Sequence, residues 1–152
     1  MQIGLAIKRS LLDLAHDNGR SKLIMTSDEL LERLIDFAVR VGKVVDALTD
    51  TRMGRHIAGQ FVRSGTSPAP NYDEGCAAES RADFIHKLSI CLKELRESRT
   101  WIRLMIKTEM LPEYRMGELL DECNQLCNII GQSIVTAKEN RSKKASAGSQ
   151  VI

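Results

Sequence analysis

Apolar side chains recur every three or four residues in four long stretches of the chain, which is the spacing of amphipathic α-helices. The first and third predicted helices cover about residues 28–48 and 81–109. The second is predicted to begin after a cap at Asp50 or Thr51 and to end or kink near Thr66, and the fourth to have Pro112 in its first turn and to fade near Asn140. Thr26 and Glu29 form the pattern of a capping box ahead of the first helix, and Ser80 is expected to cap the third. The sequence lacks clear strand-forming clusters, so the pattern predicts an all-α protein.

The third and fourth helices have clear apolar faces. The core face of the third is predicted to consist of Phe84, Leu88, Cys91, Leu95, Ile102, Met105 and Ile106. The face of the fourth is predicted to consist of Leu119, Leu120, Cys123, Leu126, Cys127, Ile130, Ile134 and Ala137. The first helix has a broader apolar arc that includes Leu34, Ile35 and Val41, and an arc of this width indicates contact with more than one neighbour.

The second helix meets two prolines, Pro68 and Pro70, each of which removes a backbone donor and disfavours helix in the residue before it. We therefore expect this helix to end or kink near Thr66. Residues 71–75 are then predicted to form a short irregular or single-turn segment. Polar side chains in this segment can satisfy the loosened backbone, and Arg63 and Glu74 are a candidate ion pair.

Short turns between the four helices predict an antiparallel up-down-up-down four-helix bundle over residues 28–140. Residues 1–27 are predicted to form an N-terminal arm or linker. It has a weak helical pattern at 3–16, so it either docks on the bundle or lacks fixed structure. The tail, 141–152, is polar and rich in small residues, which is typical of disorder.

Composition places few further limits. The 152 residues are 43% hydrophobic, 28% charged and 4% aromatic, with a net charge of +2. This length suits one domain, and a charge of this size is too small to indicate a nucleic-acid partner by itself. The sequence shows no secretory leader and no apolar run of membrane-spanning length. We therefore predict a cytoplasmic protein with reduced thiols.

Candidate catalytic and metal sites are weak. Cys123 and Cys127 lie one helical turn apart, but both fall on the apolar face of the fourth helix, which favours a core role over metal binding. Cys76 and Cys91 add no ligand spacing, and the histidines are isolated. Since no nucleophile motif or phosphate-binding glycine loop is found, the sequence predicts no enzymatic activity, no metal and no cofactor.

A row of cations on the third helix is the clearest functional signal. Its members, which we call the basic band, are Lys93, Arg96, Arg99, Arg103 and Lys107. Cations at helical spacing can follow a phosphate backbone, so the band is a candidate nucleic-acid-binding surface. The alternative is a solvated face neutralised by Glu94, Glu97 and acids of neighbouring helices.

Ile90, Trp101 and Leu104 are predicted to lie on the side of the third helix away from the core. Large apolar groups exposed together usually mark an interface, so the three are candidate oligomer contacts. Alternatively, the N-terminal arm covers them within the same chain.

The central part of the chain resembles the four-helix-bundle family encoded in intervening sequences of bacterial 23S ribosomal RNA genes. The residues that carry the resemblance are Gln60, Arg63, Ser67, Asn71, Glu74, Gly75, Ser80, Asp83, Phe84 and Glu94. The similarity covers about residues 28–138. Tyr72 and Asp73 depart from the usual Ile and Ala of the family motif.

The resemblance implies a homopentamer and no established catalytic activity. A related protein is the accessory variability determinant of diversity-generating retroelements, a basic pentamer that partners a reverse transcriptase and nucleic acid. Two hypotheses follow. One is a non-enzymatic RNA- or DNA-binding accessory factor, with a reverse transcriptase as one conceivable partner. The other is a purely structural scaffold for another protein.

Overall fold

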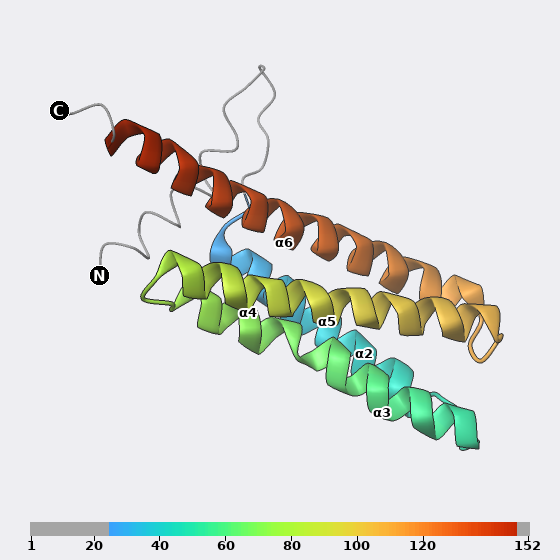
Figure 1. Ribbon diagram of the computed structural model, residues 1–152. Helices are drawn as coiled ribbons and strands as arrows, with labels where there is room; N and C mark the ends of the chain where they lie inside the picture. Colours follow the sequence, from blue (N-terminus) through green and yellow to red (C-terminus); the bar gives the residue numbers. More distant parts are fainter. Residues whose placement is uncertain (1–24, 149–152) are drawn as a thin grey trace.

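The computed structural model describes residues 25–148, and side chains from residue 25 to 139. The described helices are α2 (Ser27–Asp46), α3 (Arg52–Thr66), α4 (Pro68–Cys76), α5 (Arg81–Lys107) and α6 (Glu113–Gly148). Figure 1 shows four rods that run in alternating directions, with α3 and α4 together forming the second rod. The predicted four-helix bundle is therefore confirmed. The arm before residue 25 lies outside the described residues.

Helix starts follow the caps in the sequence. The Thr26 hydroxyl accepts a hydrogen bond from the backbone N–H of Glu29, and the Glu29 carboxylate accepts one from the N–H of Thr26 at 2.6 Å. Thr51 and Ser80 cap α3 and α5 in the same way, by accepting from the third residue beyond them. Each cap satisfies amides that the first helical turn leaves without partners.

The second rod kinks at the prolines, as predicted, but the segment after the kink is helical. Ser67 ends α3 and precedes α4, in a helical conformation with φ −68° and ψ −31°. Pro68 and Pro70 fall in the first turn of α4, where their missing N–H groups would have had no helical partner. The Asn71 amide donates to the Ser67 carbonyl at 2.9 Å and to its hydroxyl at 3.0 Å. The prediction of a short irregular or single-turn segment at 71–75 was therefore wrong, because these residues belong to a helix of nine residues.

The core draws on every helix. Fully or almost fully buried side chains include Leu30, Leu34, Phe37, Val41, Ile57, Phe61, Tyr72, Phe84, Leu88, Leu95, Ile102, Met105, Met116, Leu119, Leu126 and Ile130. Each such aliphatic or aromatic side chain contributes about 1.5–3 kcal/mol relative to exposure. The predicted faces of the third and fourth helices are thus confirmed, with Ile106, Leu120 and Ala137 at their half-buried margins.

Close helix approach requires glycine at two points. A Cβ on Gly65 would lie 2.6 Å from Val41 Cγ2, so α2 packs directly on the backbone of α3. A Cβ on Gly75 would lie 2.9 Å from Leu88 Cδ1, where α4 meets α5. Between α3 and α5, the buried Ser98 hydroxyl donates to the Ser64 hydroxyl at 2.9 Å, which satisfies two polar groups inside the core.

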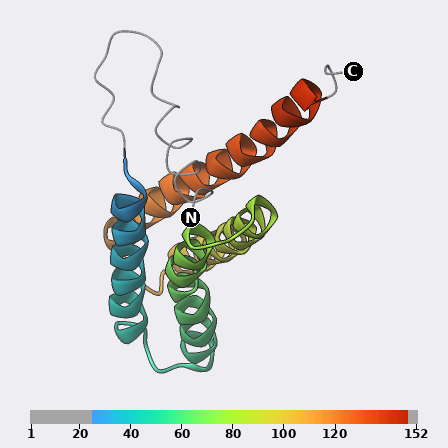
Figure 2. The ribbon, with the colours of Figure 1, turned by 90° about the vertical axis from the view of Figure 1, so that its left-hand side faces the viewer.

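Helix α6 continues to Gly148, past Asn140 where the sequence predicted it to fade. In both views its C-terminal end separates from the other rods (Figure 2). Among the residues whose side chains are described, Ile134 is the last buried apolar residue of this helix. Residues 141–148 continue this helix, the disorder expected for the tail stays a prediction, and 149–152 lie outside the described residues.

Candidate nucleic-acid interface

Helix α5 carries the basic band as a row on its outer side. Lys93, Arg96, Arg103 and Lys107 are exposed, and Arg99 is half-buried. Within the described part of the chain, none of the five forms an ion pair with a carboxylate. Neighbours in the row are three or four residues apart, so like charges face one another at a spacing that destabilises a helix slightly.

The acids of α5 that could neutralise the band turn toward α3 instead. The Arg63 guanidinium donates to Glu94 at 3.2 Å and also to Glu97. The hydrogen bond from Arg63 lowers the pKa of the Glu97 carboxyl below its usual value, because it stabilises the ionised form. The two acids of α5 nearest to the band are therefore paired with Arg63, and Lys93 adds a smaller electrostatic effect on Glu97.

This arrangement corrects the predicted pairing of Arg63 with Glu74. Glu74 instead accepts from Lys87 at 2.6 Å, across the junction of α4 and α5. The remaining motif residues lie nearby on the second rod: Gln60 is half-buried on α3, and Asn71 and Gly75 act at the kink and at the α4–α5 contact. The motif thus supports packing, with Arg63 joining α3 to α5.

The predicted oligomer contacts lie closer to the core than expected. Trp101 and Leu104 are half-buried and pack against the core, and Ile90 is half-buried. The Trp101 ring meets His56 edge-on with centroids 5.9 Å apart, and its indole N–H donates to Glu97 at 3.4 Å. The prediction that all three point away from the core was wrong for Trp101 and Leu104, because α3 covers that side of α5.

Exposed large apolar side chains occur on the first two rods and on α6. Ile35 and Val39 lie one turn apart on α2 with 40% and 52% of their surface exposed, and Val62 on α3 is 38% exposed. The sequence analysis placed Ile35 inside the core arc and did not single out the other two. Ile35 and Val39 are four residues apart and therefore share one side of α2. This spacing could have distinguished their side from the buried face formed by Leu34 and Val41.

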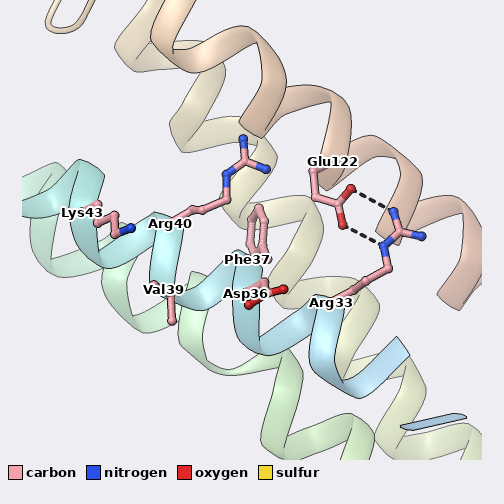
Figure 3. A pocket seen from close by; sticks show the side chains of 7 residues that line it. All are labelled: Arg33, Asp36, Phe37, Val39, Arg40, Lys43 and Glu122. Atoms are coloured by element: carbon pink, nitrogen blue, oxygen red, sulfur yellow. Dashed lines mark hydrogen bonds and ion pairs between the residues drawn. The ribbon is translucent and has the colours of Figure 1, made fainter. Parts of the chain in front are cut away.

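A second charged region lies between α2 and α6, at an open pocket of about 350 Å³; Figure 3 shows the side chains that line it. Its lining residues are Arg33, Asp36, Phe37, Val39, Arg40, Lys43 and Glu122. Arg33 donates to both Glu122 oxygens, at 3.0 and 2.8 Å, and Arg40 lies 4.0 Å from Glu118. We call these two cation–carboxylate pairs the α2–α6 seam. Its arginines have partners within the chain, so the hollow is a weak site for an added anion.

Three of the four cysteines are packed in the hydrophobic core. Cys91, Cys123 and Cys127 are buried, and the Cys123 thiol donates to the Leu95 carbonyl at 3.3 Å. Burial raises the pKa of Cys91 to about 12. Within the described residues, no three His, Cys, Asp or Glu side chains are grouped as metal ligands.

Comparison with known proteins establishes the family. Residues 27–132 match the model of the 23S rRNA-intervening sequence protein family. The chain belongs to this family. A solved structure from Bacteroides thetaiotaomicron VPI-5482, described as a protein of unknown function from the S23 ribosomal protein family, is 30% identical. The match covers 71% of this chain and 96% of that one, with a TM-score of 0.66.

Membership in the 23S rRNA-intervening sequence protein family confirms the resemblance seen in the motif residues. No curated protein matches the chain. Tyr72, where the family motif has an aliphatic residue, is 1% exposed, so the larger side chain is accommodated in the core. None of the described helices combines the length and apolarity that crossing a bilayer requires.

Proposed function

We propose that this protein acts without catalysis as an oligomeric accessory factor that binds nucleic acid, RNA foremost, through the basic band. The observation that supports it is the contrast in pairing along α5: its nearest acids bind Arg63, and five cations on the outer side have no carboxylate partner among the described residues. A polyanion would relieve the repulsion within this row and gain charge-assisted contacts. The setting would be cytoplasmic, where the thiols of the four cysteines stay reduced.

The size of the band suits a phosphate backbone. From Lys93 to Lys107 the helix rises about 21 Å at 1.5 Å per residue. That distance spans several consecutive phosphates, and each contact releases counterions and makes the affinity salt-dependent.

Self-assembly is the second part of the proposal, with a homopentamer as the expected form. The exposed Ile35, Val39 and Val62 support an interface on α2 and α3, and the half-buried Ile90 offers further apolar surface on α5. A ring would repeat the basic band in each subunit and strengthen binding to a long polyanion through avidity. Size-exclusion chromatography with light scattering tests this: a monomer at micromolar concentration would contradict it.

The same apolar side chains support a second candidate, a structural scaffold whose partner is another protein, such as a reverse transcriptase. Hydrophobic contacts of this kind would depend weakly on salt, whereas a phosphate interface would depend on it steeply. Salt dependence therefore separates the two candidates.

The decisive variant is Arg96→Glu with Arg103→Glu, tested by filter binding of RNA. Two lost phosphate contacts should weaken binding about 60-fold near 0.1 M salt, since each contact contributes roughly eightfold there. The matched control is Arg52→Glu with Arg115→Glu, two exposed arginines off the band with no ion pair to a described residue. Both variants change the net charge equally. Equal losses in the two would refute the band as the binding surface.

A further inference from the structure

We infer that the nucleic acid held by the basic band is a double helix, contacted along its backbone, rather than a single strand. This inference rests on the proposed function and adds the class of ligand. It depends on three features: the rigidity of the row, the position of the aromatic side chains, and the polar residues of α6 beside it.

The row is rigid because one helix supplies every cation. Helix α5 spans 27 residues, begins at the Ser80 cap and buries a continuous face that includes Leu88, Leu95 and Ile102. The five cations therefore hold a fixed line along the outer side. A duplex offers phosphates in an equally stiff arrangement, while a flexible strand would lose conformational entropy to match a straight row.

Aromatic side chains are not available beside the row. Proteins that hold single strands without sequence preference interleave cations with aromatic rings on which the bases stack. Phe37, Phe61, Phe84 and Tyr72 are buried in the core. Trp101 is half-buried, with its edge against His56 and its N–H bonded to Glu97.

The one remaining aromatic residue is Tyr114, which is 77% exposed. It lies in the first turn of α6, past the end of α5, and Arg115 stacks over its ring at 5.9 Å. A single ring beyond the end of the row cannot provide successive stacking platforms between the cations. The band can therefore bind phosphates through its cations, but it lacks the aromatic rings on which unstacked bases would stack.

Helix α6 places two asparagines next to the band, on a side that also carries the exposed Asp121. Its register against α5 follows from Cys123, which donates to the Leu95 carbonyl, and from Gly131, where a Cβ would lie 4.0 Å from Leu92. Asn124 and Asn128 stand on the side of α6 that includes Gly131, one turn apart. Their amides can donate to phosphate or sugar oxygens across the width of a duplex backbone.

The test compares two RNAs with the full-length protein at one salt concentration. One is a duplex of about 20 base pairs and the other an unstructured oligouridine of roughly 40 nucleotides, which carry similar numbers of phosphates. We expect the duplex to bind at least about tenfold more tightly. Equal or tighter binding of oligouridine would overturn the duplex inference and leave the proposed function intact. Binding of neither RNA would overturn the proposed function itself.

A variant on α6 tests the position of the duplex. Asn128→Asp adds one negative charge beside the band with little change in shape, and we expect it to weaken duplex binding roughly threefold. Thr49→Glu, in the turn between α2 and α3, adds the same charge at an exposed position away from α5. Duplex affinities that are equal in the two variants would contradict a duplex lying across α5 and α6. Thermal unfolding of both variants confirms that the fold is retained.

Discussion

The basic band and the α2–α6 seam are both rich in arginine, but within the described part of the chain the seam arginines have carboxylate partners and the band arginines do not. At the seam, Arg33 makes two hydrogen bonds to Glu122 (Figure 3). It makes a third, at 3.0 Å, to Gln125. On the outer side of α5, Arg96 and Arg103 have no such partner among the described residues. The first arrangement joins two helices. The second leaves charge free for a ligand, so pairing, rather than the number of cations, distinguishes structure from candidate function.

The largest effect on stability is expected at the seam. Arg33→Gln should lower the free energy of unfolding by about 2 kcal/mol, because it removes charge-assisted hydrogen bonds from a partly buried carboxylate. Urea denaturation measures the loss. Adding Glu122→Gln should recover part of it, since the remaining buried charge is then removed. Losses that simply add would show that the two side chains are not coupled.

An acid introduced into the band should form ion pairs with its arginines, as the carboxylates of the seam do. Thr100 is exposed on α5, one turn from both Arg96 and Arg103. Thr100→Glu should pair with these arginines, weaken RNA binding about tenfold and raise stability by about 0.5 kcal/mol. Thr100→Gln is the neutral control and should change neither quantity appreciably. RNA affinity that is unaltered by Thr100→Glu would contradict the importance of unpaired charge.

The stability that the Arg63–Glu97 ion pair contributes should depend on pH. The Arg63 hydrogen bond lowers the pKa of folded Glu97 below its usual value of 4.5. Its contribution to stability is therefore complete above pH 4.5 and lost as the pH falls through the folded pKa. The stability difference between the wild type and Arg63→Gln should persist at neutral pH and shrink in acid. Urea denaturation across this range checks it, and a constant difference would exclude the ionised pair as its cause.

The smallest effect is expected at the other end of the seam. Arg40 lies at the limiting distance of 4.0 Å from Glu118, whose side chain is 91% exposed. Arg40→Gln should therefore change the free energy of unfolding by less than about 0.5 kcal/mol. A loss comparable to that of Arg33→Gln would mean that the whole seam, and not the Arg33 pair, holds α2 to α6.

Local sequence signals predicted the helices well. Thr26 and Ser80 correctly predicted where their helices begin, because capping depends on residues within one turn. The faces that include Leu95 and Leu126 followed from periodicity alone. The helicity of α4 was missed because Pro68 and Pro70 suggested a break, although prolines are tolerated in a first helical turn.

Contacts between helices were harder to predict. Arg63 was matched with Glu74 in the same rod, but its partners come from α5, whose register against α3 is not encoded in either segment alone. Trp101 was placed outside for the same reason, since periodicity within α5 does not show that His56 of α3 covers it. The spacing of its cations identified the band in the sequence. That these cations form no ion pair with Glu94 or Glu97 could be seen only in the structure, where both acids are oriented toward Arg63.

Affinity for RNA across a salt series tests the central claim most directly. If three to five band cations contact phosphates, binding of a duplex RNA should fall at least about 40-fold between roughly 50 and 200 mM salt. The Arg96→Glu, Arg103→Glu variant should show a shallower dependence. An affinity that stays constant over this range in the wild-type protein would contradict the account.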